Sequence, residues 1–136
     1  MSVINIHTID HVVLRTDKLS AMLDFYQHIL GCKSERCEES IGLYQLRAGD
    51  ALIDIVPVNS PLGKEGGPPP GEQGHNMDHV CLQLSPFNGP EILQFLDAQG
   101  VSRSDIERRY GAKGFGPSIY IYDPEGNRVE LKGPPE

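Results

Sequence analysis

The sequence predicts an α+β protein built from two tandem copies of one β-α-β-β-β module. The motif Asp-His-Val-x-Leu occurs twice, in "TIDHVVLRT" and in "NMDHVCLQL", and its histidines, His11 and His79, are 68 residues apart in a chain of 136. After each motif come an amphipathic segment that ends in glycine and then short strand-like runs. Three features that recur in the same order favour a duplicated module over coincidence.

The first module, 8–58, begins with a β-branched run at 10–15 that predicts a strand. Apolar residues then recur at helical spacing in "SAMLDFYQHILG", and Gly31 ends this helix. The segment 57–76 is too rich in glycine and proline for a regular element, so we expect a connection or a lid there. Short strands are expected between the helix and this segment at 33–37, 41–46 and 51–58.

The second module, 77–132, repeats the plan of the first. A strand is expected at 77–84, followed by a helix in "GPEILQFLDAQG" and a strand-like run at 101–109. After the glycine-rich "YGAKGFG" come strands at 117–122 and 128–132, joined by the turn "DPEG". The two modules and their connection are expected to form a single domain, 1–136.

Composition narrows the class of partner. A net charge of −7 argues against nucleic acid, because phosphate backbones are bound mainly by clustered Lys and Arg. No apolar stretch approaches the ~20 residues of a membrane span, and the N-terminus lacks a targeting pattern. We therefore expect a cytoplasmic protein with a small-molecule substrate, in which the three cysteines are free thiols.

Four polar side chains lie on the faces of the predicted strands that are turned away from the helices. Alternation places His11 on one strand face and Asp10, Val12 and Leu14 on the other, and His79 is arranged in the same way. Glu130 lies opposite Val129 and Leu131, and Asp54 interrupts an otherwise apolar strand. Alone, each of these residues is more often structural or solvated. Their joint placement in a repeat favours one divalent-metal site made by the four residues His11, Asp54, His79 and Glu130.

Two imidazoles and two carboxylates suit Zn, Ni, Co, Mn or Fe(II) better than Ca or Mg. With four protein ligands, an octahedral ion keeps two positions for water or for two adjacent substrate oxygens.

These segments resemble the vicinal oxygen chelate superfamily, which includes glyoxalase I, bleomycin and fosfomycin resistance proteins and extradiol dioxygenases. The similar stretches are "IDHVVLRTDKLSAMLDFYQHILG", "GDALIDI", "MDHVCLQL" and the closing hairpin "SIYIYDPEGNRVELK". The resemblance implies that both modules form a cupped half-barrel sheet around the ion with helices on the outside. Such a site is completed either within one chain or across a homodimer.

The resemblance also implies that His11, His79 and Glu130 are ligands. Asp54 stands where glyoxalase I has a glutamate ligand. Family members with three-ligand sites have no ligand at this position. Aspartate is one methylene shorter than glutamate. Two alternatives therefore follow: the Asp54 carboxylate binds the ion directly, or it binds the ion through a water.

Three functions follow as alternatives. The first is a glyoxalase-like lyase or isomerase, in which Glu130, or else Asp54, shuttles a proton. The second is a three-ligand thiol transferase or Fe(II) dioxygenase, and the third is a metal-free antibiotic-binding module. In addition, Arg15, Lys113 and Tyr120 are candidate substrate-binding residues.

Overall fold

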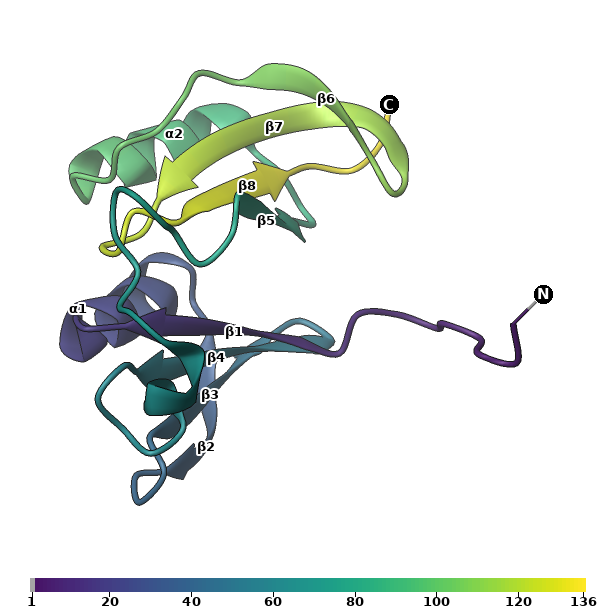
Figure 1. The fold of residues 1–136 in the computed structure, drawn as a ribbon. Coiled ribbons are helices and arrows are strands. Elements are labelled where there is room, and N and C mark those ends of the chain that lie inside the picture. The colour runs from purple at the N-terminus through teal and green to yellow at the C-terminus, as the bar shows by residue number, and fades with distance from the viewer. Residues whose placement is uncertain (1) are drawn as a thin grey trace. The chain divides into compact units, whose positions relative to one another are not determined.

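The computed structural model describes residues 2–136 and divides into two compact units. The first unit ends at Pro69 and the second comprises Pro70–Glu136. Each unit contains a strand, a helical segment and three further strands, in that order (Figure 1). The predicted α+β class with two tandem βαβββ modules is therefore confirmed.

The first unit is a mixed four-stranded sheet with the order β1-β4-β3-β2. The parallel pair β1 and β4 lies at one edge, and the other pairs are antiparallel. The helix α1 packs beside β4 and continues directly into a π-helical turn, η1. The bounds are β1 (His11–Thr16), α1 (Leu19–Asp24), η1 (Phe25–Ile29), β2 (Lys33–Glu38), β3 (Leu43–Ala48) and β4 (Ala51–Pro57).

The core of this unit lies between the helix and one face of the sheet. Met22 and Tyr26 of the helical segment are fully buried, as are Leu14 of β1 and Ile55 of β4. Strand neighbours point to opposite faces, so the residues on either side of Leu14 and Ile55 belong to the face away from the helix. That face carries His11 and Asp54.

The second unit repeats this topology with the sheet order β5-β8-β7-β6. Its parallel pair is β5 and β8, and the hairpins β6–β7 and β7–β8 are antiparallel. Buried Leu96 of the helix and the buried strand residues Ile119, Ile121, Val129 and Leu131 form its core. The bounds are β5 (His79–Gln83), α2 (Gly89–Ala98), β6 (Glu107–Gly111), β7 (Gly114–Tyr122) and β8 (Arg128–Lys132).

The glycine-rich stretch "YGAKGFG", which the sequence analysis leaves outside the expected strands, lies largely within two strands. Strand β6 starts at Glu107 and runs on to Gly111, and β7 begins at Gly114, so the two strands form a tight hairpin. Tyr110 and Phe115 face each other across it, with ring centroids 4.9 Å apart. The positive φ of Gly114, 109°, explains why glycine stands at this turn.

The connection between the modules contains a short 3-10 helix, η2 (Gly63–Gly66). Arg15 of β1 anchors it by donating five hydrogen bonds to the carbonyl oxygens of Gly63, Gly66, Gly67 and Pro68. The start of the connection is thus fixed to the first sheet.

Within residues 2–136, no helix combines the length and the apolar character that a membrane crossing requires.

Candidate functional site

In the second unit, the structure brings His79 and Glu130 together. They lie on the neighbouring parallel strands β5 and β8, and His79 Nε2 is 3.3 Å from Glu130 Oε1. Glu130 is 5% exposed, whereas the His79 side chain is 32% exposed. The pair therefore joins a nearly buried carboxylate to an imidazole that solutes can reach.

The other nitrogen of His79 is held by the preceding residue. Asp78 Oδ2 lies 2.5 Å from His79 Nδ1 and 2.7 Å from Arg128 Nη2. These two hydrogen bonds, from His79 first and Arg128 second, lower the pKa of Asp78. An ionised carboxylate only accepts hydrogen bonds, so His79 Nδ1 is the donor to Asp78. Such a carboxylate–histidine contact orients histidines that bind metals.

The second oxygen of Glu130 is fixed from β7. Ser118 Oγ donates to Glu130 Oε2 at 2.9 Å and accepts from Arg109 Nη1 of β6 at 3.0 Å. Ser118 is fully buried, which keeps water from replacing its hydroxyl. Glu130 is thereby held with one oxygen on Ser118 and the other turned to His79.

In the first unit, His11 and Asp54 share one face of the sheet. Asp54 lies opposite Val13 in the register of β1 and β4, and Val13 is on the His11 side of β1. His11 Nδ1 is 2.6 Å from Asp10 Oδ1, which repeats the arrangement of the second unit. The hydrogen bond with Asp10, and to a lesser extent the charges of Asp54 and Asp10, raise the pKa of His11.

Asp54 already has a partner of its own in the first unit. Its carboxylate is 2% exposed and accepts from Gln45 Nε2, at 3.4 Å to Oδ1 and 3.3 Å to Oδ2. These contacts are long, and an amide leaves the negative charge of the carboxylate in place. Asp54 therefore differs from Glu130, which is held by a hydroxyl and lies against its histidine.

The two units thus offer two half-sites of similar chemistry, each with one imidazole and one carboxylate. The donor types fit a divalent ion, because imidazole nitrogens and carboxylate oxygens are common ligands of such ions and an aspartate engages the Nδ1 atom of each histidine, which leaves Nε2 as the ligating nitrogen. Within the part of the chain that the structure describes, no three His, Cys, Asp or Glu side chains gather into a group that could hold a metal. The four-ligand site remains a prediction.

The predicted substrate-binding residues have different surroundings. The guanidinium of Arg15 is engaged by backbone carbonyls of the connection, which gives it a structural role. Lys113 is exposed in the β6–β7 turn. Tyr120 is opposite Glu130 in the register of β7 and β8, and its ring contacts that of His79 edge-on at 5.8 Å. Of the three, Tyr120 lies beside the His79–Glu130 pair.

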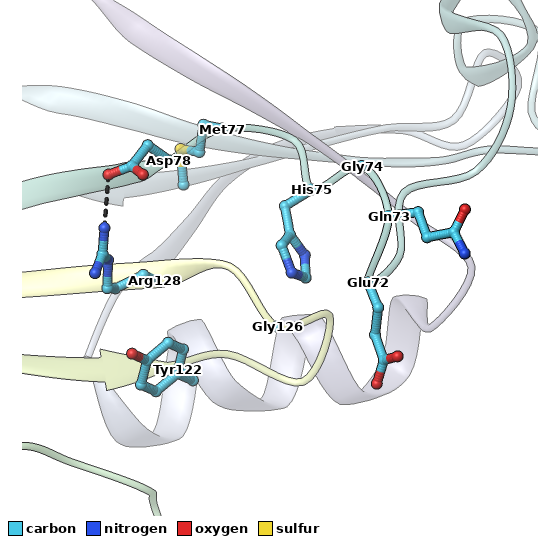
Figure 2. A pocket seen from close by; sticks show the side chains of 9 residues that line it. All are labelled: Glu72, Gln73, Gly74, His75, Met77, Asp78, Tyr122, Gly126 and Arg128. Atoms are coloured by element: carbon cyan, nitrogen blue, oxygen red, sulfur yellow. Dashed lines mark hydrogen bonds and ion pairs between the residues drawn. The ribbon is translucent and has the colours of Figure 1, made fainter.

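The second unit has a pocket of about 550 Å³, whose lining includes Asp78, the residue that holds the ring of His79, but neither His79 nor Glu130. Figure 2 shows Arg128 and Asp78 joined at one side of it, with Tyr122 below them and His75 projecting from the loop towards Gly126. Its lining comes from the loop before β5 and from the ends of β7 and β8: Glu72, Gln73, Gly74, His75, Met77, Asp78, Tyr122, Gly126 and Arg128.

Five residues of these arrangements were not identified from the sequence: Asp10, Gln45, Asp78, Arg109 and Ser118. The aspartates had a signal, because each directly precedes the repeated histidine. Strand alternation predicts that Asp10 points away from His11, and the contact between them corrects that expectation. Ser118 and Arg109 carry no local signal, because their contacts depend on the register of β6, β7 and β8.

Comparison with known proteins gives a family match. The model of the Glyoxalase/Bleomycin resistance protein/Dioxygenase superfamily matches residues 8–131. The chain is also 31% identical over 135 residues to Virulence protein STM3117 of Salmonella typhimurium, covering 93% of this chain and 83% of that protein. The crystal structure of STM3117 superposes with a TM-score of 0.81 at 24% identity, over 96% of this chain and 99% of that chain.

Two further solved structures share the fold at lower identity. Lactoylglutathione lyase from Agrobacterium tumefaciens has a TM-score of 0.66 at 19% identity, over 93% of this chain and 92% of that chain. The fosfomycin resistance protein FosX from Listeria monocytogenes has a TM-score of 0.69 at 22% identity, over 94% and 91%. At these identities the likeness establishes the fold and leaves the reaction open.

Proposed function

Because the chain belongs to the Glyoxalase/Bleomycin resistance protein/Dioxygenase superfamily, we propose that it is a divalent-metal-dependent, glyoxalase-like lyase or isomerase. Its substrate is a small carbonyl or thiol-conjugated molecule with two neighbouring oxygens. The observation that carries the proposal is the recurrence, in both units, of an imidazole oriented by the preceding aspartate on the sheet face that also bears a carboxylate.

In this proposal His11, Asp54, His79 and Glu130 hold the ion, which is Zn, Ni, Co, Mn or Fe(II). When bound, such an ion acts as a Lewis acid for vicinal oxygens and makes the adjacent C–H more acidic. Asp10 and Asp78 fix the orientation of the two imidazoles. Glu130 is the first candidate to take up and return the substrate proton, and Asp54 is the second.

The contact of Asp54 with Gln45 favours a second candidate function. If the amide keeps the shorter aspartate from the ion, His11, His79 and Glu130 form a three-ligand site. Such a site suits a resistance-type thiol transferase or an Fe(II) extradiol dioxygenase. We also propose that the protein acts as a homodimer in the cytoplasm.

Metal analysis of purified protein with four single variants tests the ligand set. His11→Ala, His79→Ala and Glu130→Ala should each lose most of the bound metal. His28→Ala is the matched control, because His28 is exposed and its imidazole lies 3.6 Å from the exposed carboxylate of Asp24, away from the predicted ligands in sequence. A full metal complement in all three ligand variants contradicts the site, and metal-free wild-type protein would favour the antibiotic-binding alternative.

A second experiment separates the two enzymatic candidates. The hemithioacetal of glutathione and methylglyoxal is assayed with the wild type and with Asp54→Glu, whose longer side chain reaches one methylene further. Higher isomerase activity in Asp54→Glu supports an incomplete fourth ligand. No isomerase activity in either protein, together with thiol transfer or ring cleavage by the wild type, supports the three-ligand function.

A further inference from the structure

The N-terminal arm, residues 2–9, carries the most exposed large apolar side chains of the described residues. Four aliphatic side chains of the arm are 73% to 96% exposed: Val3, Ile4, Ile6 and Ile9. Figure 1 shows the arm running out from the start of β1 as an irregular segment. Within residues 2–136 its hydrogen bonding is local, from Ile4 N to Ser2 Oγ at 2.9 Å. The first unit therefore leaves this apolar surface uncovered.

The sequence of the arm favours a β-strand. The stretch "SVINIHTI" contains five β-branched residues, a type that is enriched in strands because it packs well on a pleated surface. Strand alternation places Ile4 and Ile6 on one face and Asn5 on the other. A strand also needs a neighbour for its backbone N–H and C=O groups. The arm is thus suited to complete a sheet to which it does not yet belong.

Strand β6 offers an unpaired edge with exposed apolar surface. It is the outer strand of the second sheet and pairs with β7 alone among the described strands. Tyr110 is 71% exposed, more than any other large apolar side chain in the outer strands of the two sheets, and it contacts the exposed ring of Phe115. The guanidiniums of Arg108 and Arg109 lie over the rings of Phe115 and Tyr120, so both are folded back onto the sheet.

The outer strand of the first sheet, β2, is a poorer acceptor. Four of its six residues are charged, and its pairing with β3 shifts register between Ser34 and Arg36. Charged side chains and bulges are two ways in which proteins keep edge strands from pairing. The pairing of β6 with β7 has no such shift. Strand β6 is therefore the edge that an added strand fits better.

We propose that the arm of one copy adds as a strand to the free edge of β6 in a second copy, and that the two copies exchange arms reciprocally. Ile4 and Ile6 then cover Tyr110 and Phe115, because β-branched and aromatic side chains form favourable pairs across strands. Backbone hydrogen bonds along the edge supply the rest of the contact. The inference rests on the homodimer of the proposed function, to which it gives a contact surface, and it is independent of the metal site.

Charge favours a second copy as the partner. One chain carries both halves of the contact, the uncovered arm and the unpaired edge. The arm contains no Lys, Arg, Asp or Glu, and β6 has two arginines for one glutamate, although the chain carries a net charge of −7. A contact between these two segments avoids the repulsion expected between two acidic molecules.

The area is also sufficient for a stable dimer. An extended segment of about 0.9 kDa, the mass of the arm, exposes about 1,300 Å². If strand addition covers half of each arm, reciprocal exchange buries roughly 2,600 Å² on the two copies together, more than the ~1,600 Å² of a typical stable interface. Exchange of identical segments is a common route to such dimers.

Sedimentation equilibrium of the full-length chain over a concentration series measures the dissociation constant of the dimer. The arm variant Ile4→Asp/Ile6→Asp and the edge variant Tyr110→Asp should each raise this constant about 100-fold or more. One buried aliphatic or aromatic side chain contributes about a factor of ten, and each contact occurs twice in the dimer.

Each variant has a matched control. Asn5→Asp adds a carboxylate between the two isoleucines of the arm without removing an aliphatic side chain. Tyr122→Asp alters another exposed tyrosine of the second unit, which lies on β7 and outside the edge strand. Both controls should dimerise like the wild type, and thermal melts establish that all variants are folded.

Mixing the arm variant with the edge variant tests the exchange directly. Their heterodimer keeps one intact contact, from the arm of the edge variant to β6 of the arm variant, so dimers should reappear in the mixture. Hydrogen exchange of the wild type needs no substitution. The amides of the arm and of β6 should exchange more slowly above the dissociation constant than below it.

The outcomes separate this contact from the rest of the proposed function. A wild type that stays monomeric would overturn both the contact and the homodimer, and protection of the arm in that monomer would show docking on its own chain. A dimer that resists either variant would overturn the contact between the arm and β6 and leave the homodimer standing. Metal content is measured independently, so failure of the metal proposal is recognised separately.

Discussion

Replacing Ser118 by alanine should destabilise the second unit through Glu130. The substitution removes the hydroxyl that donates to Glu130 Oε2 at 2.9 Å and accepts from Arg109 Nη1 at 3.0 Å. Arg109 keeps its bond to the Ser118 carbonyl, so most of the loss falls on the carboxylate. Glu130 is 5% exposed, which leaves little room for water to take over.

The expected cost follows from the type of hydrogen bond. A hydrogen bond to a charged group contributes about 1.5–3 kcal/mol, so Ser118→Ala should lower the free energy of unfolding by about 2 kcal/mol. With a urea m-value of about 2 kcal/mol/M, the midpoint should fall by about 1 M. Ser102→Ala, at an exposed serine, is the control and should stay within about 0.5 kcal/mol of wild type.

A double-mutant cycle identifies the interaction responsible. In a Glu130→Gln background the serine hydroxyl faces a neutral amide, and Ser118→Ala should cost about 1 kcal/mol less than in the wild type. An unfolding free energy for Ser118→Ala within 0.5 kcal/mol of wild type would refute the reasoning. An equal loss in both backgrounds would show that the charge of Glu130 is not what Ser118 stabilises.

Three further predictions concern the aspartates, the connection and the cysteines. Asp10→Asn and Asp78→Asn should each lower metal affinity about 10–100-fold in competition with a chromogenic chelator, because they orient the imidazoles; an unchanged affinity would contradict that role. Arg15→Met should speed tryptic cleavage after Lys64, because five hydrogen bonds to the segment 63–68 are lost; an unchanged cleavage rate would mean that the segment is held in another way. Burial raises the pKa of the Cys32 thiol, so at pH 8 it carries less of the reactive thiolate and should need denaturant to react with a disulfide reagent, whereas exposed Cys37 should react in the native protein; comparing Cys32→Ser with Cys37→Ser measures this.

The fold was predictable because hydrophobic alternation and helix periodicity recur in both halves. The strand predicted at 128–132 is β8 with the same bounds, and Val129 and Leu131 face the core as expected. The hairpin β6–β7 was not predicted, because the glycines of "YGAKGFG" indicate a loop. The Tyr110–Phe115 pair across the strands, with Arg108 on Phe115, supplies packing that local propensity does not register.

The site was predictable only in part, because the sequence pattern shows which face of a strand a residue occupies but not which residues of the neighbouring strands it meets. Alternation alone places Glu130 on the face of β8 that lies beside His79, and the structure finds the pair in contact. The contacts of Ser118 and Arg109 depend on the pairing of Arg109 with Gly116 and of Ser118 with Lys132. The first pairing follows from the β6–β7 turn, which was not predicted, so the position of Arg109 was not predictable either. The second belongs to the predicted β7–β8 hairpin, but strand alternation does not show that the Ser118 hydroxyl reaches Glu130.

The repeated Asp-His motif shows why strand alternation misplaced the aspartates. In both units the strand begins at the histidine, so Asp10 and Asp78 precede the regular pleat and their side chains are not bound to the opposite face. In the second unit the register pairs His79 with Arg128, which brings the arginine within reach of Asp78. An aspartate one residue before the strand can thus hold the histidine ring and, through Arg128, connect it to Tyr120. In the second unit, the short motif therefore orients the candidate ligand His79 through its own aspartate, whose position is in turn fixed by Arg128.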